Sequence, residues 1–192
     1  TKQNVVEKSG LKEEAGFSIE ASAKAFFILS DGLYSNKVKA VVRELSTNAY
    51  DAHVEAGCSE KPFEVHLPNS IDSEFRVRDY GVSLSHEDVM HLYTTYFGSN
   101  KRNSNSLNGC LGLGSKSPFA YTDQFWVTTY IDGKKRNYVA TVDSEGSRLD
   151  EYPECDTDEA NGFEVGFVVK EEDFSKFKDT AQQVYKYFKT QP

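Results

Sequence analysis

Cysteine is scarce in this chain of 192 residues, and the three cysteines that it has are far apart. Cys58, Cys110 and Cys155 show none of the spacings that mark a zinc site or a disulfide framework. The sequence therefore does not support a fold stabilised by metal or disulfides. A reducing cytoplasm is the compartment that we expect.

Long apolar runs and net positive charge are also missing. No apolar run approaches the roughly 20 residues that cross a bilayer, and we expect no signal peptide. The formal net charge of -8 argues against a wide basic face for duplex DNA, because clustered Lys and Arg drive such binding. We expect no transmembrane segment and no nucleic-acid partner.

A zinc-protease helix is absent as well, although residues 86–91 suggest one at first sight. His86 and His91 are five residues apart, whereas HExxH needs a spacing of four to put both imidazoles on one helix face. His53 and His66 are isolated, and we expect them to be structural or exposed. No zinc site is assigned.

Large aromatic side chains are abundant: the chain has 13 Phe, 11 Tyr and one Trp. Together with the length, they predict one folded domain with a sizeable core. Residues 1–15 are polar and aperiodic and are expected to form an N-terminal arm, with residues 16–192 forming the domain. Because the chain begins at Thr1 and stops just after a helical pattern, we expect it to be part of a larger protein.

The pattern of apolar residues predicts both helices and strands. We expect helices at residues 22–29, 37–55, 85–92 and from 174 onwards, and strands at residues 16–19, 63–67, 75–79, 124–131, 135–143 and 163–170. Asn36 is placed to cap the helix 37–55 and Gly57 to end it, and Asp132-Gly133 suits a tight hairpin. The order predicts an α+β fold, a two-layer sandwich with helices on one face of a mixed, mostly antiparallel sheet.

Three polar residues follow one line along the helix 37–55. Glu44, Asn48 and Asp51 recur at i, i+4 and i+7, beside the apolar stripe of the same helix. Taken alone, such a triplet is more often a solvated helix flank than a site. Its interpretation depends on the segments that follow.

Asp79 ends a strand of alternating pattern, on the same predicted face as the apolar Phe75 and Val77. A carboxylate in that position is costly unless a hydrogen-bond donor, such as a ligand amine, satisfies it. An Asp that closes a turn at Tyr80-Gly81 is the structural alternative.

The loop 94–115 is long and rich in Gly, Ser and Asn, which suggests a lid. It ends in glycines that would let backbone N–H groups approach phosphate, and Pro118 could occupy the first turn of a following helix. A loop without a ligand is the alternative. It is not a P-loop, because Ser115 separates Gly114 from Lys116.

Together these segments resemble the gyrase, heat-shock chaperone, histidine kinase and MutL (GHKL) superfamily of ATPases, over residues 43 to about 169. Residues 44–52, Glu-Leu-Ser-Thr-Asn-Ala-Tyr-Asp-Ala, are similar to its ExxxNxxDA motif. Residues 79–83 are similar to DxGxG, with Ser83 in place of the last glycine, and residues 109–114 are similar to GxxGxG. Of the fourth motif, Gly-Thr before a strand, Gly162 is kept and Phe163 replaces the Thr.

The resemblance implies the Bergerat ATP-binding fold, with ATP and Mg²⁺ as cofactors. Glu44 would polarise the attacking water, Asn48 would hold Mg²⁺, and Asp79 would receive the adenine amino group. The implied nucleotide-binding residues are Asn48, Asp51, Ala52, Asp79, Gly81, Ser99, Lys101, Gly109, Leu111, Gly112, Leu113, Gly114, Ser115 and Lys116.

The runs 39–45, 96–99 and 111–123 are also similar to the amino-terminal domain of the rIIA-like rapid-lysis proteins of T-even bacteriophages. This resemblance implies a larger phage protein in the host cytoplasm or at the inner membrane surface. Its partners would be a second copy or an unknown host or phage protein.

Three functions remain open on the sequence alone. The first is slow ATP hydrolysis with a lid that controls dimer or partner contacts. The second is a nucleotide-gated interaction module without meaningful turnover. A histidine-kinase catalytic domain is the weakest, because the lid matches the other branch better and no phosphoacceptor helix is visible.

Overall fold

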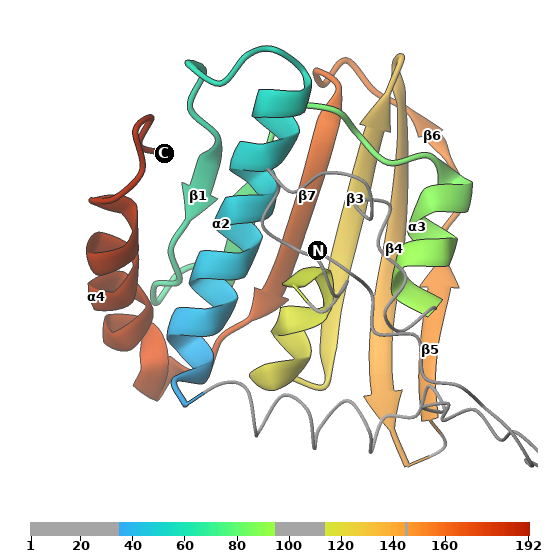
Figure 1. Cartoon of the computed structure of the whole chain (residues 1–192). Helices are drawn as coiled ribbons and strands as arrows, with labels where there is room; N and C mark the ends of the chain where they lie inside the picture. The colour runs from blue at the N-terminus through green and yellow to red at the C-terminus, as the bar shows by residue number, and fades with distance from the viewer. Residues whose placement is uncertain (1–34, 95–113, 145) are drawn as a thin grey trace, which may run out of the picture.

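The computed structural model describes residues 35–94, 114–144 and 146–192, which form one sheet with helices against one of its faces (Figure 1). The expected arm 1–15, the elements expected within residues 16–29 and most of the loop 94–115 lie outside the described residues. In chain order the elements are α2 (Lys37–Glu55), β1 (Glu64–His66), β2 (Glu74–Arg78), α3 (His86–Thr94), η1 (Gly114–Ala120), β3 (Gln124–Ile131), β4 (Lys134–Asp143), β5 (Gly146–Glu151), β6 (Cys155–Asp156), β7 (Gly162–Val168), η2 (Glu171–Asp173) and α4 (Phe174–Tyr185).

The described strands pair in the order β1-β2-β7-β3-β4-β5, and β6 pairs with β4. Each of these pairs is antiparallel. The predicted α+β class with a mostly antiparallel sheet and helices on one face is confirmed. The C-terminal strand β7 lies between β2 and β3, and this position brings residues near 163 beside those near 79.

Helix α2 has the bounds that its sequence predicts. The Asn36 side chain caps it by accepting the Lys39 N–H at 3.0 Å, and Gly57 follows it with a φ of 72°. The apolar stripe that includes Val41 and Leu45 is buried against the sheet. Figure 1 shows α2 between α4 and η1, both of which it contacts.

Aromatic rings form the part of the core that holds α4. Phe177 lies with its ring centroid 5.2 Å from that of Phe75, 5.2 Å from that of Tyr121 and 5.9 Å from that of Phe167. Burying each such side chain contributes about 1.5–3 kcal/mol. Phe188 lies beyond the end of α4, although the sequence predicts a helix from residue 174 onwards, and its ring packs against Phe63.

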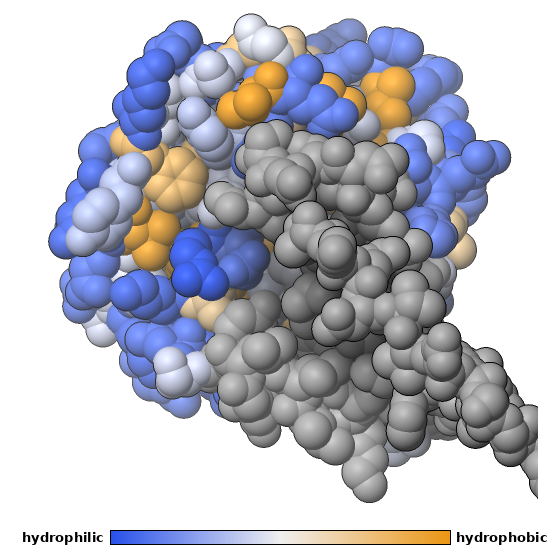
Figure 2. Space-filling view, viewed as in Figure 1, coloured by the Kyte–Doolittle hydropathy of each residue, from blue (hydrophilic) through white to orange (hydrophobic). Residues whose placement is uncertain are grey.

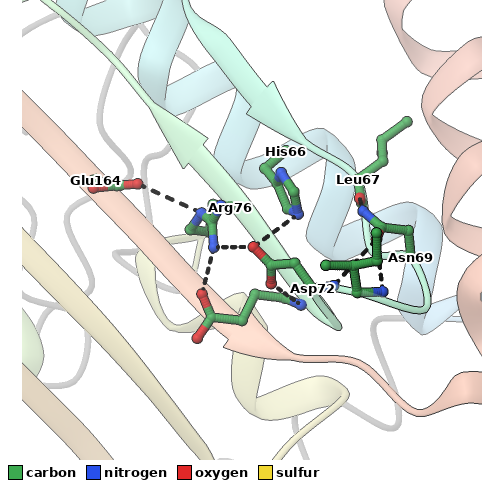
Figure 3. A network of polar contacts seen from close by, with 8 residues as sticks. His66, Leu67, Asn69, Asp72, Arg76 and Glu164 are labelled. Carbon is green, nitrogen blue, oxygen red and sulfur yellow. Dashed lines mark hydrogen bonds and ion pairs between the residues drawn. The ribbon is translucent and has the colours of Figure 1, made fainter.

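The turn between β1 and β2 is held by a polar network (Figure 3). Asn69 Oδ1 accepts the N–H groups of Ile71 and Asp72, at 2.9 and 3.1 Å. Arg76 donates to Asp72 at 2.8 Å and to Glu74 at 2.7 Å. The strands expected at residues 63–67 and 75–79 thus form an antiparallel hairpin, and side-chain bonds fix its turn.

Two features differ from expectation. The acidic segment 150–159, where the sequence predicts no strand, contributes the end of β5 and the whole of β6. Asp150 and Glu151 of β5 pair with Val139 and Tyr138 in the middle of β4, and β6 pairs with Lys134 and Lys135 at the start of β4. Lys134 Nζ lies 2.5 Å from Asp156 at this edge, so opposite charges replace the apolar pattern that would have predicted a strand. Pro118 lies inside the 3₁₀ helix η1 and not in the first turn of a new helix.

The Asp132-Gly133 turn between β3 and β4 is confirmed, because both residues have positive φ, 50° and 78°. No helix among the described residues is long and apolar enough to cross a membrane. Figure 2 shows mainly hydrophilic side chains on the described surface around the helices, with hydrophobic ones in small separate groups.

Candidate nucleotide site

The polar edge of α2 is less exposed than a solvated helix flank. Glu44 and Asn48 are half-buried, and the side chain of Asp51 is buried. Arg43 Nη2 lies 2.8 Å from Glu44 Oε1 and occupies that oxygen. The three polar groups are thus partly or fully shielded from solvent.

The loop after β2 packs directly on the C-terminal turns of α2. A Cβ added at Gly81 would lie 2.3 Å from the backbone C and O of Ala52, so only glycine allows this approach. Val82 N–H donates to Ala52 O at 3.3 Å, and Gly81 N–H donates to Asp79 Oδ1 at 3.0 Å. These contacts set the carboxylate of Asp79 close to α2, as the strand alternation predicts.

Asp79 is 5% exposed, and burial raises the pKa of its carboxyl to about 7. The Gly81 and Phe163 amides and the charge of Arg78 act in the opposite direction without cancelling the desolvation. An ionised Asp79 would therefore gain from a ligand that donates a hydrogen bond to it. This is the chemistry that an amino group on a base supplies.

The raised pKa gives a stability prediction. Because the folded-state pKa of about 7 lies above the ordinary value of 3.8, the folded protein holds more protons between these values, and stability falls as the pH rises through this window. Asp79→Asn should remove this dependence and raise the free energy of unfolding at about pH 8, by an amount on the order of a few kcal/mol at most. Urea unfolding of both proteins at about pH 5 and about pH 8 measures it. If the free energy of unfolding changed with pH by the same amount in the wild type and in Asp79→Asn, the prediction would be contradicted.

The end of the glycine-rich loop lies beside the polar edge of α2. A Cβ added at Gly114 would lie 2.8 Å from Glu44 Oε2 and 3.8 Å from Asn48 Nδ2. The backbone at the start of η1 therefore approaches both side chains that the motif predicts to act on the attacking water and on the metal. The other predicted residues of this loop, Ser99, Lys101, Gly109, Leu111, Gly112 and Leu113, lie outside the described residues.

Lys116 is buried, at 1% exposure, and its Nζ donates to the carbonyl of Leu92 near the end of α3. Burial lowers the pKa of its amine to about 8. The bond links η1 to α3, the two elements on either side of residues 95–113 in the sequence. Lys116 was predicted to bind nucleotide; here its described hydrogen bond is to a helix end, and Ser115 beside it is half-buried.

Each of the two residues that depart from the motifs contacts a residue of the other motif. Ser83 Oγ donates to Gly162 O at 2.6 Å, and Asp79 N–H donates to Phe163 O at 2.9 Å. A Cβ at Gly162 would lie 2.1 Å from Asp79 O, so this position also requires glycine. The serine that replaces a motif glycine therefore fastens the loop to β7, a contact that the sequence did not predict.

A concave region lies beside strands β1, β2, β7 and the end of β3, away from the polar edge of α2. A cavity of about 560 Å³ is lined by residues that include Glu64, Arg76, Arg78, Tyr130 and Glu164. Its charged groups bind one another or the backbone: Arg78 donates to Asp79 O and Ala160 O, at 2.6 Å each, and Tyr130 donates to Glu164 at 2.9 Å. We assign no ligand to this cavity.

The described residues contain no cluster of three or more His, Cys, Asp or Glu side chains that could hold a metal ion. Mg²⁺ at phosphate sites is usually held by one or two side chains together with the phosphates, and the Asn48 amide oxygen suits that role. No protein-family model matches the sequence, and a search of curated proteins finds no match either.

Proposed function

We propose that this chain is a GHKL-type domain that binds ATP with Mg²⁺ in the region bounded by α2, the loop 79–83 and the start of η1, and that it hydrolyses ATP slowly. The proposal includes the rIIA-like resemblance: a domain of a larger phage protein, in the host cytoplasm or at the inner membrane surface. Nucleotide binding would then control contacts with a second copy or another protein.

The observation that carries the proposal is the meeting of four segments that are far apart in the chain. Residues 44–52 contact Gly114 near one end and residues 79–83 at the other, and residues 79–83 also contact residues 162–163. Each was selected from the sequence by a separate motif. Two of the approaches, at Gly81 and Gly162, tolerate no side chain, so the arrangement depends on the motif glycines themselves.

Each residue of the region has a chemical role that suits its surroundings. The buried Asp79 would accept a hydrogen bond from the adenine amino group, and Gly81 keeps the loop against α2. Asn48 would hold Mg²⁺, which would neutralise phosphate charge when bound. Glu44 Oε2, next to Gly114, would accept a proton from an attacking water.

One observation favours the second function, a nucleotide-gated interaction module without turnover. Arg43 Nη2 lies 2.8 Å from Oε1 of the carboxylate that would act as general base, so only Oε2 is left to contact an attacking water. Steady-state phosphate release from ATP with Mg²⁺ separates the two functions. Release in proportion to protein concentration supports hydrolysis, whereas saturable binding without release supports the module.

A further inference from the structure

His53 is a fully buried imidazole that the proposed site does not use directly. It follows Ala52 on α2, has no exposed surface, and packs edge-on against Phe63. Both of its ring nitrogens have hydrogen-bond partners. Nε2 lies 2.7 Å from the backbone N of Tyr80, and Nδ1 lies 2.9 Å from the carbonyl O of Lys61.

The two partners determine where the ring proton lies. The Tyr80 N–H can only donate, so Nε2 must be an acceptor without a proton. The Lys61 carbonyl can only accept, so Nδ1 must carry the hydrogen. The ring is therefore in the neutral Nδ1–H tautomer, and a proton on Nε2 would face the Tyr80 N–H and break that bond.

The hydrogen bond from the Tyr80 N–H to His53 holds the residue that directly follows Asp79. The loop 79–82 is held on α2 by the Val82 bond to Ala52 O, by the close approach of Gly81, and by this imidazole. Among these three contacts, only that of His53 is made by a side chain of α2. The same side chain also holds the segment before β1, through its bond to the Lys61 carbonyl. A change in this ring would move the peptide that carries the Asp79 carboxylate.

We propose that His53 is a positioning residue for base recognition: through the Tyr80 N–H it fixes the Asp79 carboxylate where it selects a purine with a 6-amino group, such as adenine, over one with a 6-oxo group. This inference rests on the proposed ATP site. It assigns to His53 the selection of the base and leaves the binding of phosphate to other residues.

Two conservative variants test the two hydrogen bonds of the His53 ring one at a time. His53→Gln places a side-chain oxygen near the position of Nε2, where it can accept the Tyr80 N–H. His53→Asn places an amide nitrogen near the position of Nδ1, where it can donate to Lys61 O. Each variant loses one buried hydrogen bond, so both should have a lower Tm, and only His53→Asn releases the Tyr80 loop.

The readout is the affinity of each protein for ATP, GTP and inorganic triphosphate with Mg²⁺. We expect His53→Asn to lower the preference for ATP over GTP by about tenfold or more, with triphosphate affinity unchanged, and His53→Gln to retain the preference. Equal preferences in the two variants, with wild-type ATP binding intact, would overturn the role of His53 alone. No ATP binding by the wild type would overturn the proposed function as well.

Amide hydrogen exchange tests the positioning without any nucleotide. The Tyr80 N–H should exchange faster in His53→Asn than in His53→Gln, because only the first variant lacks its acceptor. The Cys58 N–H, which donates to the His53 carbonyl at 2.8 Å, is the reference and should exchange alike in both. Equal exchange at Tyr80 in the two variants would contradict the inference whatever the nucleotide result.

Discussion

Replacing Asp79 by Asn is expected to lower the affinity for ATP by about 100-fold or more, because a buried carboxylate that receives the base amine is lost. The variant should still fold, since its amide oxygen can accept the Gly81 N–H as Asp79 Oδ1 does at 3.0 Å. Calorimetric titration with ATP and Mg²⁺ measures the change, and circular dichroism checks the fold.

Asp179→Asn is the matched control, because it makes the same change of charge at an exposed position of α4. It should bind ATP as the wild type does. If Asp79→Asn folded and bound ATP with unchanged affinity, Asp79 would not be the base-recognising group, and the site would have to lie elsewhere.

Replacing Glu44 by Gln is expected to reduce ATP turnover by about 10² to 10⁴-fold, the usual contribution of a general base. Binding of ATP should stay close to that of the wild type, since the amide keeps the size and most contacts of the carboxylate. Single-turnover and steady-state phosphate release measure the loss of rate, and calorimetry measures the affinity.

Glu55→Gln, at the exposed C-terminal end of the same helix, is the control for Glu44→Gln. It should leave both turnover and affinity unchanged. Unchanged turnover in Glu44→Gln would remove Glu44 from the catalytic assignment and leave ATP binding in place.

Helix caps, turn residues and apolar periodicity correctly predicted the elements whose bounds are set by residues close together in the sequence. The Asn36 cap, the apolar stripe and Gly57 gave α2 its bounds, and Asp132-Gly133 gave the β3–β4 hairpin. Strand alternation placed Asp79 inward, and its 5% exposure confirms this. These signals act over a few residues and do not need the tertiary structure.

The contacts that the sequence did not predict join distant parts of the chain. The bond from Ser83 to Gly162 exists because β7 lies between β2 and β3, an order that no local pattern encodes. The partners of His53 were missed for the same reason, since a single histidine on a helix has many ordinary structural roles. Strand β6 was missed because its pairing relies on exposed charges and not on apolar alternation.

Calorimetric titration of the wild-type chain with ATP in the presence of Mg²⁺ tests the central claim most directly. The proposed function predicts saturable binding at one site per chain, with weaker binding of GTP. Absence of saturable heat, for protein shown to be folded, would contradict the assignment of a nucleotide site to α2, the loop 79–83 and η1.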